Sequence, residues 1–359
     1  MDLTRPSSFH LQWHITERCN LNCSHCYQDP EFVSKELEFK DLKEILENFV
    51  YQLKKWNIPK PAVKVSVTGG EPMIREDFFD FLKELNYRGD FLTYGLLTNG
   101  TFLDKKKVSK LEDLNVDYVQ VSLEGMEEIN DRIRGKGTFK QIENAVDLLK
   151  DSNIGFTNIS MTVNQMNFSD VPLMIEFAEK KGIHLAIKRL VPHGMGEKMK
   201  DNILTIPQSK KVFDYGHRKG VFFGCEDGIL SNQFPSYRPH RCSAGYMSFT
   251  VMPNGDVYPC RKLPILCGNL MQESFFDIYH SDKMKEIRDL NKMNDVCHQC
   301  PNEKCLRGSR CLAYGYFGDE TAPDPHCQRL FQKLPDPDLK WKNSSDKRER
   351  KLNQRWIKK

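Results

Sequence analysis

Residues 9–191 repeat one pattern, in which a short apolar and often β-branched run is followed by an amphipathic stretch with helical spacing. The runs typical of strands lie at 9–16, 62–70, 91–100, 117–125, 154–163 and 183–191. The stretches typical of helices lie between them, at 41–56, 76–86, 104–114, 138–152 and 171–182. Strands that alternate with helices form a parallel sheet with right-handed crossovers. Six such units are too few for a closed eight-stranded barrel, so the pattern predicts an α/β fold that is an open, partial (β/α)6 barrel of the TIM type.

The unusual motifs of this region each follow one of the predicted strands. A cysteine-rich loop follows the first strand, and the later strands are followed by TGGEP (68–72), LTNG (97–100), SLEG (122–125), MTVN (161–164) and RLVPHG (189–194). In α/β sheets, ligands bind at the carboxyl ends of the strands. Loop glycines alone most often mark turns, but their position at one edge beside cysteines predicts a single site there.

The loop after the first strand reads CNLNCSHCY and holds Cys19, Cys23 and Cys26 in the spacing C-x₃-C-x₂-C. A structural zinc site needs four ligands, and His25 lies between two of the cysteines, where we expect its side chain to point away. An iron–sulfur cluster accepts thiolates at such short spacings. Three thiolates on a four-iron cluster leave one iron open to a further ligand, so the loop favours an iron–sulfur cluster that binds such a ligand. A zinc site is the alternative.

CNLNCSHCY, the GGEP motif and the six repeated units resemble the radical S-adenosylmethionine (radical SAM) enzymes over roughly residues 9–195. The resemblance implies that the open iron chelates the amino and carboxylate groups of SAM. It also implies that an electron from the cluster cleaves SAM to a 5′-deoxyadenosyl radical, which abstracts hydrogen from a substrate. An electron donor such as flavodoxin or ferredoxin is then a required partner.

The same resemblance implies contacts to the methionyl part of SAM. Gly69 and Gly70 would let the backbone approach a charged ligand closely, and Glu71 or the backbone of its loop would accept from the SAM ammonium. Ser122 would lie near SAM, although it could equally be a turn residue. Arg134 would pair with the SAM carboxylate, although it could equally be a surface charge.

Further contacts are implied at the ends of the first and last strands. The backbone around His25 and Tyr27 resembles the adenine contact of the family. Leu190 matches a family contact after the last strand, with a place in the core as the alternative. Position 124 differs from the family pattern, because this chain has Glu124 where related enzymes often carry Asp in an SxDG motif.

The nine remaining cysteines all lie after residue 224, in a chain whose middle has none. Two of them bound a C-x₁₂-G-x₄-C segment from Cys242 to Cys260, and CHQCPNEKC follows at 297–305. On spacing alone, a pair of zinc ribbons is an alternative. The pattern resembles the SPASM extension of radical SAM enzymes, which holds two auxiliary [4Fe–4S] clusters and implies three clusters in all.

The SPASM resemblance implies two sets of four ligands. We assign one cluster to Cys225, Cys242, Cys260 and Cys311 and the other to Cys297, Cys300, Cys305 and Cys327. Cys267 lies in an apolar run and is the spare cysteine. The family spacing C-x₂-C-x₅-C-x₃-C is here C-x₂-C-x₄-C-x₅-C, which puts Ser309 where a cysteine is expected and Cys311 two residues later.

The expected organisation is an N-terminal extension, the radical SAM core, a linker region, the SPASM-type domain and a basic flexible tail. Their expected bounds are 1–8, 9–195, 196–224, 225–335 and 336–359. Residues 342–359 hold eight Lys or Arg against two acids and could bind an acidic partner such as a leader peptide.

SPASM-bearing relatives mostly modify peptides or proteins, so the resemblance implies peptide maturation by oxidation or cross-linking. The alternative is an oxidase or decarboxylase of a small molecule or tetrapyrrole in cofactor biosynthesis, and a non-catalytic iron–sulfur electron carrier is a third possibility. Arg261 stands where sulfatase maturases carry an Asp base, which counts against that activity. Cys19 lies close to the N-terminus and leaves no room for a leader-binding domain, so we expect recognition by the core or by a separate protein.

The composition limits the cellular location and the binding partners that we expect for the protein. There is no apolar run of membrane-spanning length and no signal-peptide pattern, so we expect a cytoplasmic protein without a membrane partner. In that compartment, twelve cysteines favour metal or redox chemistry over disulfides. The net charge of +4 is too modest to indicate nucleic-acid binding.

Overall fold

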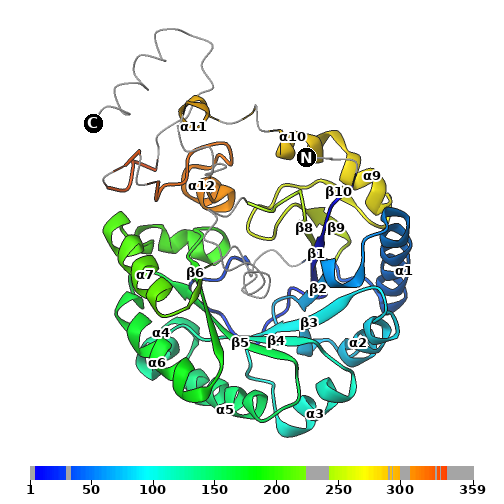
Figure 1. The fold of residues 1–359 in the computed structure, drawn as a ribbon, viewed down its shortest axis with the longest axis horizontal. Helices are drawn as coiled ribbons and strands as arrows, with labels where there is room; N and C mark the ends of the chain where they lie inside the picture. The colour runs from blue at the N-terminus through cyan, green and yellow to red at the C-terminus, as the bar shows by residue number, and fades with distance from the viewer. Residues whose placement is uncertain are drawn as a thin grey trace.

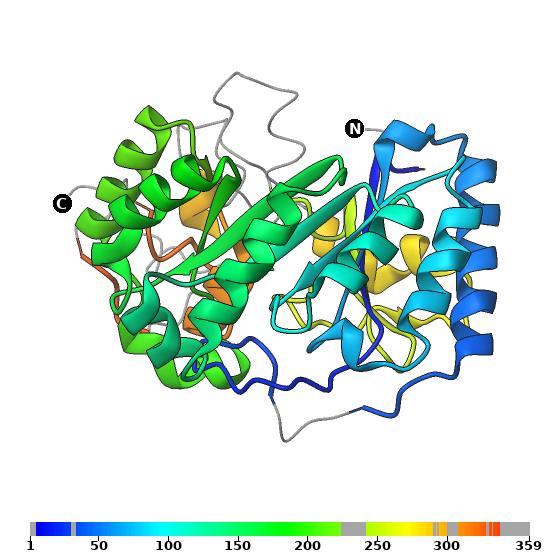
Figure 2. The same cartoon turned by 90° about the horizontal axis from the view of Figure 1, so that it is seen from below.

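The computed structural model describes residues 5–29, 34–223, 242–289, 292, 294–299, 308–327, 330–331 and 333–337. Figure 1 shows a curved sheet with helices on its outer side. In Figure 2, helix α1 (Phe39–Trp56) lies at one side of the molecule and the helices that follow the later strands lie at the other.

The six predicted strands are present and run parallel in sequence order. They are β1 (Phe9–His14), β2 (Val63–Thr68), β3 (Thr93–Thr98), β4 (Tyr118–Ser122), β5 (Phe156–Val163) and β6 (His184–Arg189). A short strand, β7 (Phe222–Phe223), continues the sheet beyond β6. The predicted partial barrel is therefore confirmed.

Helices follow the strands on the outside of the sheet. Those that were predicted are α1, α2 (Phe78–Tyr87), α3 (Lys105–Asp113), α5 (Thr138–Lys150) and α6 (Val171–Lys181). Two more, α4 (Glu127–Arg134) and α7 (Ile206–Arg218), were not predicted. Short 3₁₀ helices lie at η1 (Lys60–Ala62), η2 (Pro72–Ile74), η3 (Phe168–Asp170) and η4 (Gly194–Asn202). The region expected to be a linker thus contains α7 and β7.

Strand β1 shows how the sequence separates core from cavity. Phe9, Leu11 and Trp13 are at most 2 % exposed and pack in the main core against the outer helices. The alternate residues His10 and Gln12 face inward and line a cavity. Because side chains alternate along a strand, one strand supplies an apolar outer face and a polar inner face.

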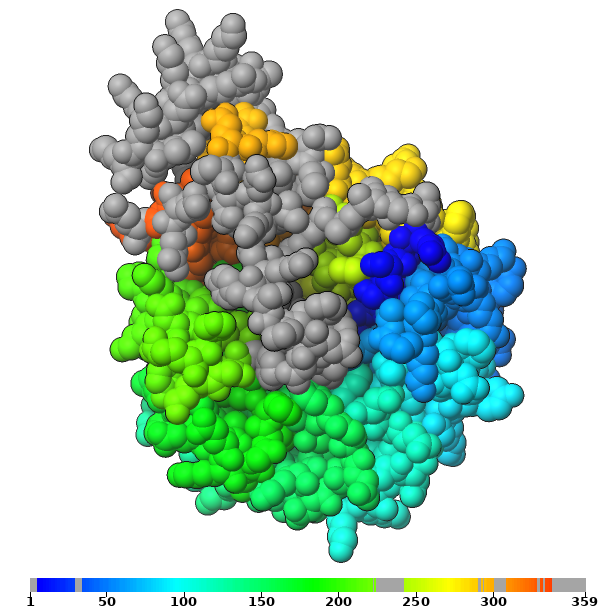
Figure 3. All heavy atoms as spheres, in the orientation of Figure 1, coloured from blue at the N-terminus to red at the C-terminus, as the bar shows by residue number. Residues whose placement is uncertain are grey.

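The described chain from residue 242 onward contacts the barrel beside its first strand and beside the residues that follow its sixth. Strand β8 (Ser248–Val251) pairs parallel with β1, and β9 (Asp256–Tyr258) and β10 (Gly268–Asn269) continue antiparallel from it. On the other side of the barrel, Val191, which follows β6, shares an apolar cluster with Leu312 of α12 (Arg310–Phe317). Figure 3 shows the yellow residues of this region against the blue N-terminal part and the orange ones beside the green part. The C-terminal region therefore spans the open side of the barrel.

The remaining described helices of this region are α9 (Phe275–His280), α10 (Asp282–Arg288) and α11 (Asp295–His298). Phe275 packs beside Phe49 of α1, with 4.9 Å between the ring centroids, and thereby ties this region to the barrel core. Among the described helices, none has both the length and the apolarity to cross a membrane.

Candidate functional site

The site is a cavity of about 660 Å³ at the carboxyl ends of the strands. Residues from every loop that the motif positions singled out contribute to its lining. They include the cysteine loop, Thr68–Gly70 at the end of β2, Thr98 and Asn99 at the end of β3, Ser122 at the end of β4, Thr162 near the end of β5 and Val191 after β6. The prediction of a single site at this edge agrees with this arrangement.

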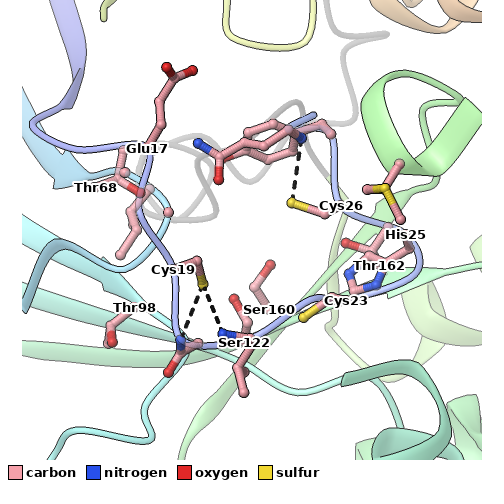
Figure 4. Close-up of a pocket in the computed structure, with 18 of the residues that line it drawn as sticks. Glu17, Cys19, Cys23, His25, Cys26, Thr68, Thr98, Ser122, Ser160 and Thr162 are labelled. Carbon is pink, nitrogen blue, oxygen red and sulfur yellow. Dashed lines mark hydrogen bonds between the residues drawn. The ribbon is translucent and has the colours of Figure 1, made fainter. Parts of the chain in front are cut away.

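The three thiols of the cysteine loop lie around one space, as Figure 4 shows. Cys19 is exposed, Cys23 is buried and Cys26 is partly buried. Burial raises the pKa of the Cys23 and Cys26 thiols, so without a metal these two thiols are held in their neutral form. A metal that binds thiolate would therefore have to displace protons from this loop.

Hydrogen-bond donors surround the three sulfur atoms. The backbone N–H of Leu21 lies 3.5 Å from the Cys19 sulfur, and that of Gln28 lies 3.4 Å from the Cys26 sulfur. The side chains of Asn99 and Arg134 lie 3.8 Å from the sulfurs of Cys19 and Cys23, respectively. Such donors stabilise sulfur that carries negative charge, as it does when it binds iron.

The cysteine loop does not have the ligand set of a mononuclear metal site. In the described part of the chain, no three His, Cys, Asp or Glu side chains converge as a mononuclear metal site requires. His25 lines the cavity, but its Nε2 lies 3.2 Å from a carboxylate oxygen of Glu124. Thiolates at such short spacings are typical of an iron–sulfur cluster, on which three cysteines would leave one position open.

The cysteine loop is held in place by backbone hydrogen bonds from the segment after β6. Gly196 N donates to Cys26 O at 2.9 Å, and Met195 N donates to Gln28 O at 3.1 Å. Gly194 has a φ of +61°, and a Cβ there would meet the Tyr27 carbonyl oxygen at 2.5 Å. Glycine is therefore required at position 194 for both its conformation and its close approach to the loop.

The Gly69–Gly70 pair also contacts the cysteine segment. A Cβ on Gly69 would lie 2.3 Å from Thr16 O, and one on Gly70 would lie 2.2 Å from Arg18 O. Gly70 N donates to Thr16 O at 2.9 Å. Both glycines line the cavity, but the close backbone approach seen in the structure is to the chain itself.

The Glu71 side chain has no exposed surface and is directed at the loop after β3. Its carboxylate accepts hydrogen bonds from the Thr98 hydroxyl at 2.8 and 2.9 Å and from Asn99 N at 2.8 Å. Burial raises the pKa of Glu71 to about 7. Gly69 and Gly70 are among the described residues that line the cavity, whereas Glu71 is not. The backbone of this loop is therefore a better candidate than the Glu71 side chain for accepting a hydrogen bond from a ligand.

Glu124 is the centre of a buried charged network. Its carboxylate lies 2.5 Å from an Arg134 nitrogen and accepts from Thr162 N at 2.6 Å, and its other contact is His25. Burial alone would raise the pKa of Glu124, but His25 and Arg134 lower it to about 2. The carboxylate is therefore charged, and it holds Arg134 beside Cys23.

The other implied SAM contacts fall into two groups. Ser122, Arg134, His25 and Tyr27 line the cavity, and Arg134 is only 8 % exposed, so it is not a surface charge. Leu190 is buried in an apolar cluster with residues that include Met199, Ile203 and Tyr316, as the core alternative expects for its side chain.

Three of the expected auxiliary ligands surround one apolar cluster. Cys242, Cys260 and Cys311 pack with residues that include Val191 and Leu263. Ser309 lies 3.2 Å from the Cys311 sulfur, so the two candidates for the displaced position are neighbours. Cys297 and Cys327 are partly buried, whereas Cys225, Cys300 and Cys305 lie outside the described residues.

Cys267 lies in a different environment. It belongs to the main core, and its sulfur donates to Ile265 O at 3.4 Å. Burial raises the pKa of this thiol to about 12. A buried neutral thiol of this kind behaves as a small apolar side chain.

Two contacts of the first cysteine segment and its flanking residues were not predicted from the sequence. Arg261, next to Cys260, lies 3.6 Å from Glu17 and 5.3 Å above the ring of Tyr27, next to Cys26. Asn99 of the LTNG motif reaches the Cys19 sulfur. The position of LTNG after a strand was a signal for Asn99, whereas nothing in the spacing pairs Arg261 with Glu17.

Comparisons with known proteins agree with this geometry. The family model described as the radical SAM superfamily matches residues 13–178, and the one described as an iron–sulfur cluster-binding domain (SPASM) matches residues 242–301. The mycofactocin maturase MftC of Mycolicibacterium smegmatis is 29 % identical, over 88 % of this chain and 82 % of that protein. The Fe-coproporphyrin III synthase of Methanosarcina barkeri is 30 % identical, over 88 % of this chain and 86 % of that protein.

A solved structure shares the fold. The crystal structure of Streptococcus suis SuiB bound to precursor peptide SuiA matches with a TM-score of 0.66 and 18 % identity, and covers 89 % of this chain and 76 % of that one. At this identity the match bears on the fold alone.

Proposed function

Because the chain belongs to the radical SAM enzymes that carry a SPASM domain, we propose that it cleaves SAM reductively and modifies a peptide or protein substrate. The observation that carries the radical SAM step is that the thiols of Cys19, Cys23 and Cys26 lie around the cavity that the strand-end loops line.

The residues of the cysteine loop would hold a [4Fe–4S] cluster through their three thiolates. When bound, the cluster supplies the electron that cleaves SAM to methionine and the 5′-deoxyadenosyl radical. Leu21 N, Gln28 N, Asn99 and Arg134 donate toward the sulfurs and stabilise their negative charge.

The residues around the thiols would bind and orient SAM. Arg134, fixed by Glu124, presents a guanidinium to the SAM carboxylate, and Ser122 offers a hydroxyl on the same side of the sheet edge. The backbone of the Gly69–Glu71 loop accepts from the SAM ammonium, and the backbone around His25 and Tyr27 contacts the adenine. Leu190 contributes through its backbone, since its side chain is buried in the core.

The auxiliary cysteines would hold two further [4Fe–4S] clusters. Cys242, Cys260 and Cys311 surround one apolar cluster, which supports their assignment to a common group together with Cys225. Cys297, Cys300, Cys305 and Cys327 form the other set. These clusters would take the electron left on the substrate after hydrogen abstraction, and a flavodoxin or ferredoxin in the cytoplasm would reduce the first cluster.

The relative named a mycofactocin maturase supports a peptide substrate. The relative named an Fe-coproporphyrin III synthase favours the second candidate, an oxidase or decarboxylase of a tetrapyrrole or other small molecule. A cavity of about 660 Å³ is within the range of small-molecule pockets, and its loop-lined mouth also suits one residue of an extended chain.

The test of SAM cleavage uses anaerobically reconstituted protein with dithionite and no substrate. We expect slow formation of 5′-deoxyadenosine and methionine, and we expect the Cys23→Ala variant to form neither product. The matched control is Cys267→Ala, which removes a buried thiol outside the site and should cleave SAM as the unaltered protein does. Unchanged cleavage by Cys23→Ala would refute the assignment.

The test of substrate class adds, in separate reactions, a peptide fraction of the source cells and Fe-coproporphyrin III. The true class should accelerate 5′-deoxyadenosine formation and change mass by loss of hydrogen or carbon dioxide. A response to the tetrapyrrole alone would replace peptide modification with the second candidate.

A further inference from the structure

Arg261, in the C-terminal region, contacts residues near both ends of the first cysteine motif. One of its guanidinium nitrogens lies 3.6 Å from a carboxylate oxygen of Glu17, which precedes the motif by two residues (Figure 4). The guanidinium also lies 5.3 Å from the ring centroid of Tyr27, the residue that follows the motif. Arg261 itself follows Cys260, an expected ligand of an auxiliary cluster. One side chain therefore connects the segments of two proposed metal sites.

The Arg261 guanidinium is buried, and its hydrogen-bonding capacity is not used up by its neighbours. The residue is 6 % exposed, and its Nε–H has no acceptor among the described residues. The 3.6 Å separation from Glu17 is longer than a hydrogen bond, and the other oxygen of that carboxylate accepts from Ser34 N at 2.8 Å and from the Ser34 hydroxyl at 2.7 Å. Glu17 therefore balances the charge of Arg261 but leaves N–H donors of the guanidinium available.

The positive charge of Arg261 reaches the cysteine loop. Burial is the main influence on the pKa of the Cys26 thiol and raises it, whereas the charge of Arg261 opposes this rise. Burial and then the charge of Arg261 lower the pKa of His14, at the end of β1, so this buried imidazole is neutral and adds no further charge. Arg261 thus acts on the loop from the Cys26 side, whereas Arg134 lies beside Cys23.

A cation and an N–H donor close to cysteine sulfur change how readily an iron–sulfur cluster accepts an electron. One-electron reduction adds one negative charge to a cluster, and nearby cations and hydrogen bonds to the sulfurs stabilise that charge. A buried guanidinium acts more strongly than an exposed one, because less water screens it. Arginine also stays charged at every pH at which the protein is folded, so its influence is permanent.

We propose that Arg261 raises the reduction potential of the cluster held by the first cysteine motif, so that the C-terminal region tunes the metal site of the barrel. The inference rests on the proposed function, because it assigns a role at the same site. The electron comes from the flavodoxin or ferredoxin of the proposed function, which is oxidised as the cluster is reduced. Arg261 is neither oxidised nor deprotonated; its charge and its N–H donors stabilise the reduced cluster.

The experiment is a redox titration of the reconstituted protein without SAM or substrate, followed by electron paramagnetic resonance. The signal of the first cluster is the one that is missing when Cys19, Cys23 and Cys26 are replaced together. Arg261→Met should make reduction of this cluster about tenfold less favourable, the size expected for one charge-assisted hydrogen bond. For one electron, this is a midpoint potential more negative by about 59 mV. Arg261→Lys keeps the charge and should stay closer to the unaltered protein than to Arg261→Met.

The variant Glu17→Gln separates an electrostatic role from a structural one. It removes the carboxylate that balances Arg261, so the midpoint potential should become more positive. If Arg261 and Glu17 only held the loop in shape, both changes would break the same contact and shift the potential in the same direction. The matched control is Arg218→Met, which removes an exposed arginine that lies 6.0 Å from the ring centroid of Tyr215 and should leave the potential unchanged.

Three results would overturn the inference. They are an unchanged potential in Arg261→Met, shifts of the same sign in Arg261→Met and Glu17→Gln, and a shift in Arg261→Lys as large as that in Arg261→Met. If Arg261→Met does not retain iron, Glu17→Gln decides, and a potential that does not rise in this variant refutes the electrostatic role. Iron content and substrate-free SAM cleavage are measured on the same samples, so failure of the proposed function is recognised separately by their absence in the unaltered protein.

Discussion

Replacement of Glu124 by Gln should destabilise the protein at neutral pH, because it removes the charge that Arg134 needs in a buried position. Glu124 is 1 % exposed and Arg134 is 8 % exposed. The interactions with His25 and Arg134 lower the pKa of Glu124 from an ordinary value of 4.5 to about 2. At about 1.4 kcal/mol for each pKa unit, this corresponds to about 3 kcal/mol of stability.

The loss of one partner of a buried ion pair costs a similar amount, about 3–5 kcal/mol. We therefore expect Glu124→Gln to lower the melting temperature of the metal-free, reduced protein by about 6 °C or more. The matched control is Glu128→Gln, which removes a carboxylate that is 83 % exposed and lies 2.9 Å from Arg132. An exposed pair contributes little, so the control should melt close to the unaltered protein.

The pH dependence gives a second test with a defined sign. Because the pKa of Glu124 is lowered in the folded state, its contribution is fully present above about pH 4.5 and is lost as the pH falls toward 2. The difference between the unaltered protein and Glu124→Gln should therefore be constant near neutral pH and shrink below pH 4.5. A melting temperature equal to that of Glu128→Gln at pH 7, or a gap that widens on acidification, would refute this account of the network.

Reconstituted protein should contain about twelve irons, and replacement of the first three cysteines together should remove about four of them. A metal analysis that finds zinc and little iron would contradict the cluster assignment. Cys311→Ala should lower the iron content or alter the spectrum of one cluster, and it should impair substrate turnover while SAM cleavage continues. Cys267→Ala should change neither the clusters nor the turnover. The reverse pattern would show that the wrong cysteine was assigned. Gly194→Ala should reduce iron retention at the first cluster, because its Cβ would meet the Tyr27 carbonyl oxygen at 2.5 Å. Gly220→Ala is its control, since Gly220 has a similar φ of +70° but nothing within 4 Å of the added Cβ, so equal effects of the two changes would exclude the clash as the cause.

Local patterns in the sequence were sufficient for the barrel and for the cysteine loop. Strand β1 alternates apolar and polar residues, and the three cysteines have a spacing that only a few metal groups use. Helix α4 was missed because EEINDRIR offers only two apolar residues, at helical spacing, among charges. Its importance lies in Arg134 at its last position, and that role depends on contacts rather than on pattern.

Contacts between distant segments could not be predicted from the sequence. Strand β8 pairs with β1 across more than 200 residues, and no local signal specifies which edge a short strand will join. Likewise the sequence marks Glu124 only as a departure from the SxDG motif, and only the structure brings His25, Arg134 and Thr162 N to its carboxylate. Glu71 shows the opposite case, in which the motif is visible in the sequence but the role of the side chain is not. The GGEP motif marks the site, whereas the Glu71 carboxylate accepts hydrogen bonds from Thr98 and Asn99 of the neighbouring loop.

The same physical constraint accounts for the open barrel and for the position of the C-terminal region. A sheet that does not close leaves two edges with unpaired backbone groups, and these must be covered. Here β8 covers the β1 edge, β7 continues the β6 edge, and α12 packs beside the residues that follow β6. The segments that cover the edges also carry Cys242, Cys260 and Cys311, and these cysteines share an apolar cluster with Val191, a residue that lines the cavity. Completion of the fold therefore places the second group of cysteines close to the cavity that the first group lines.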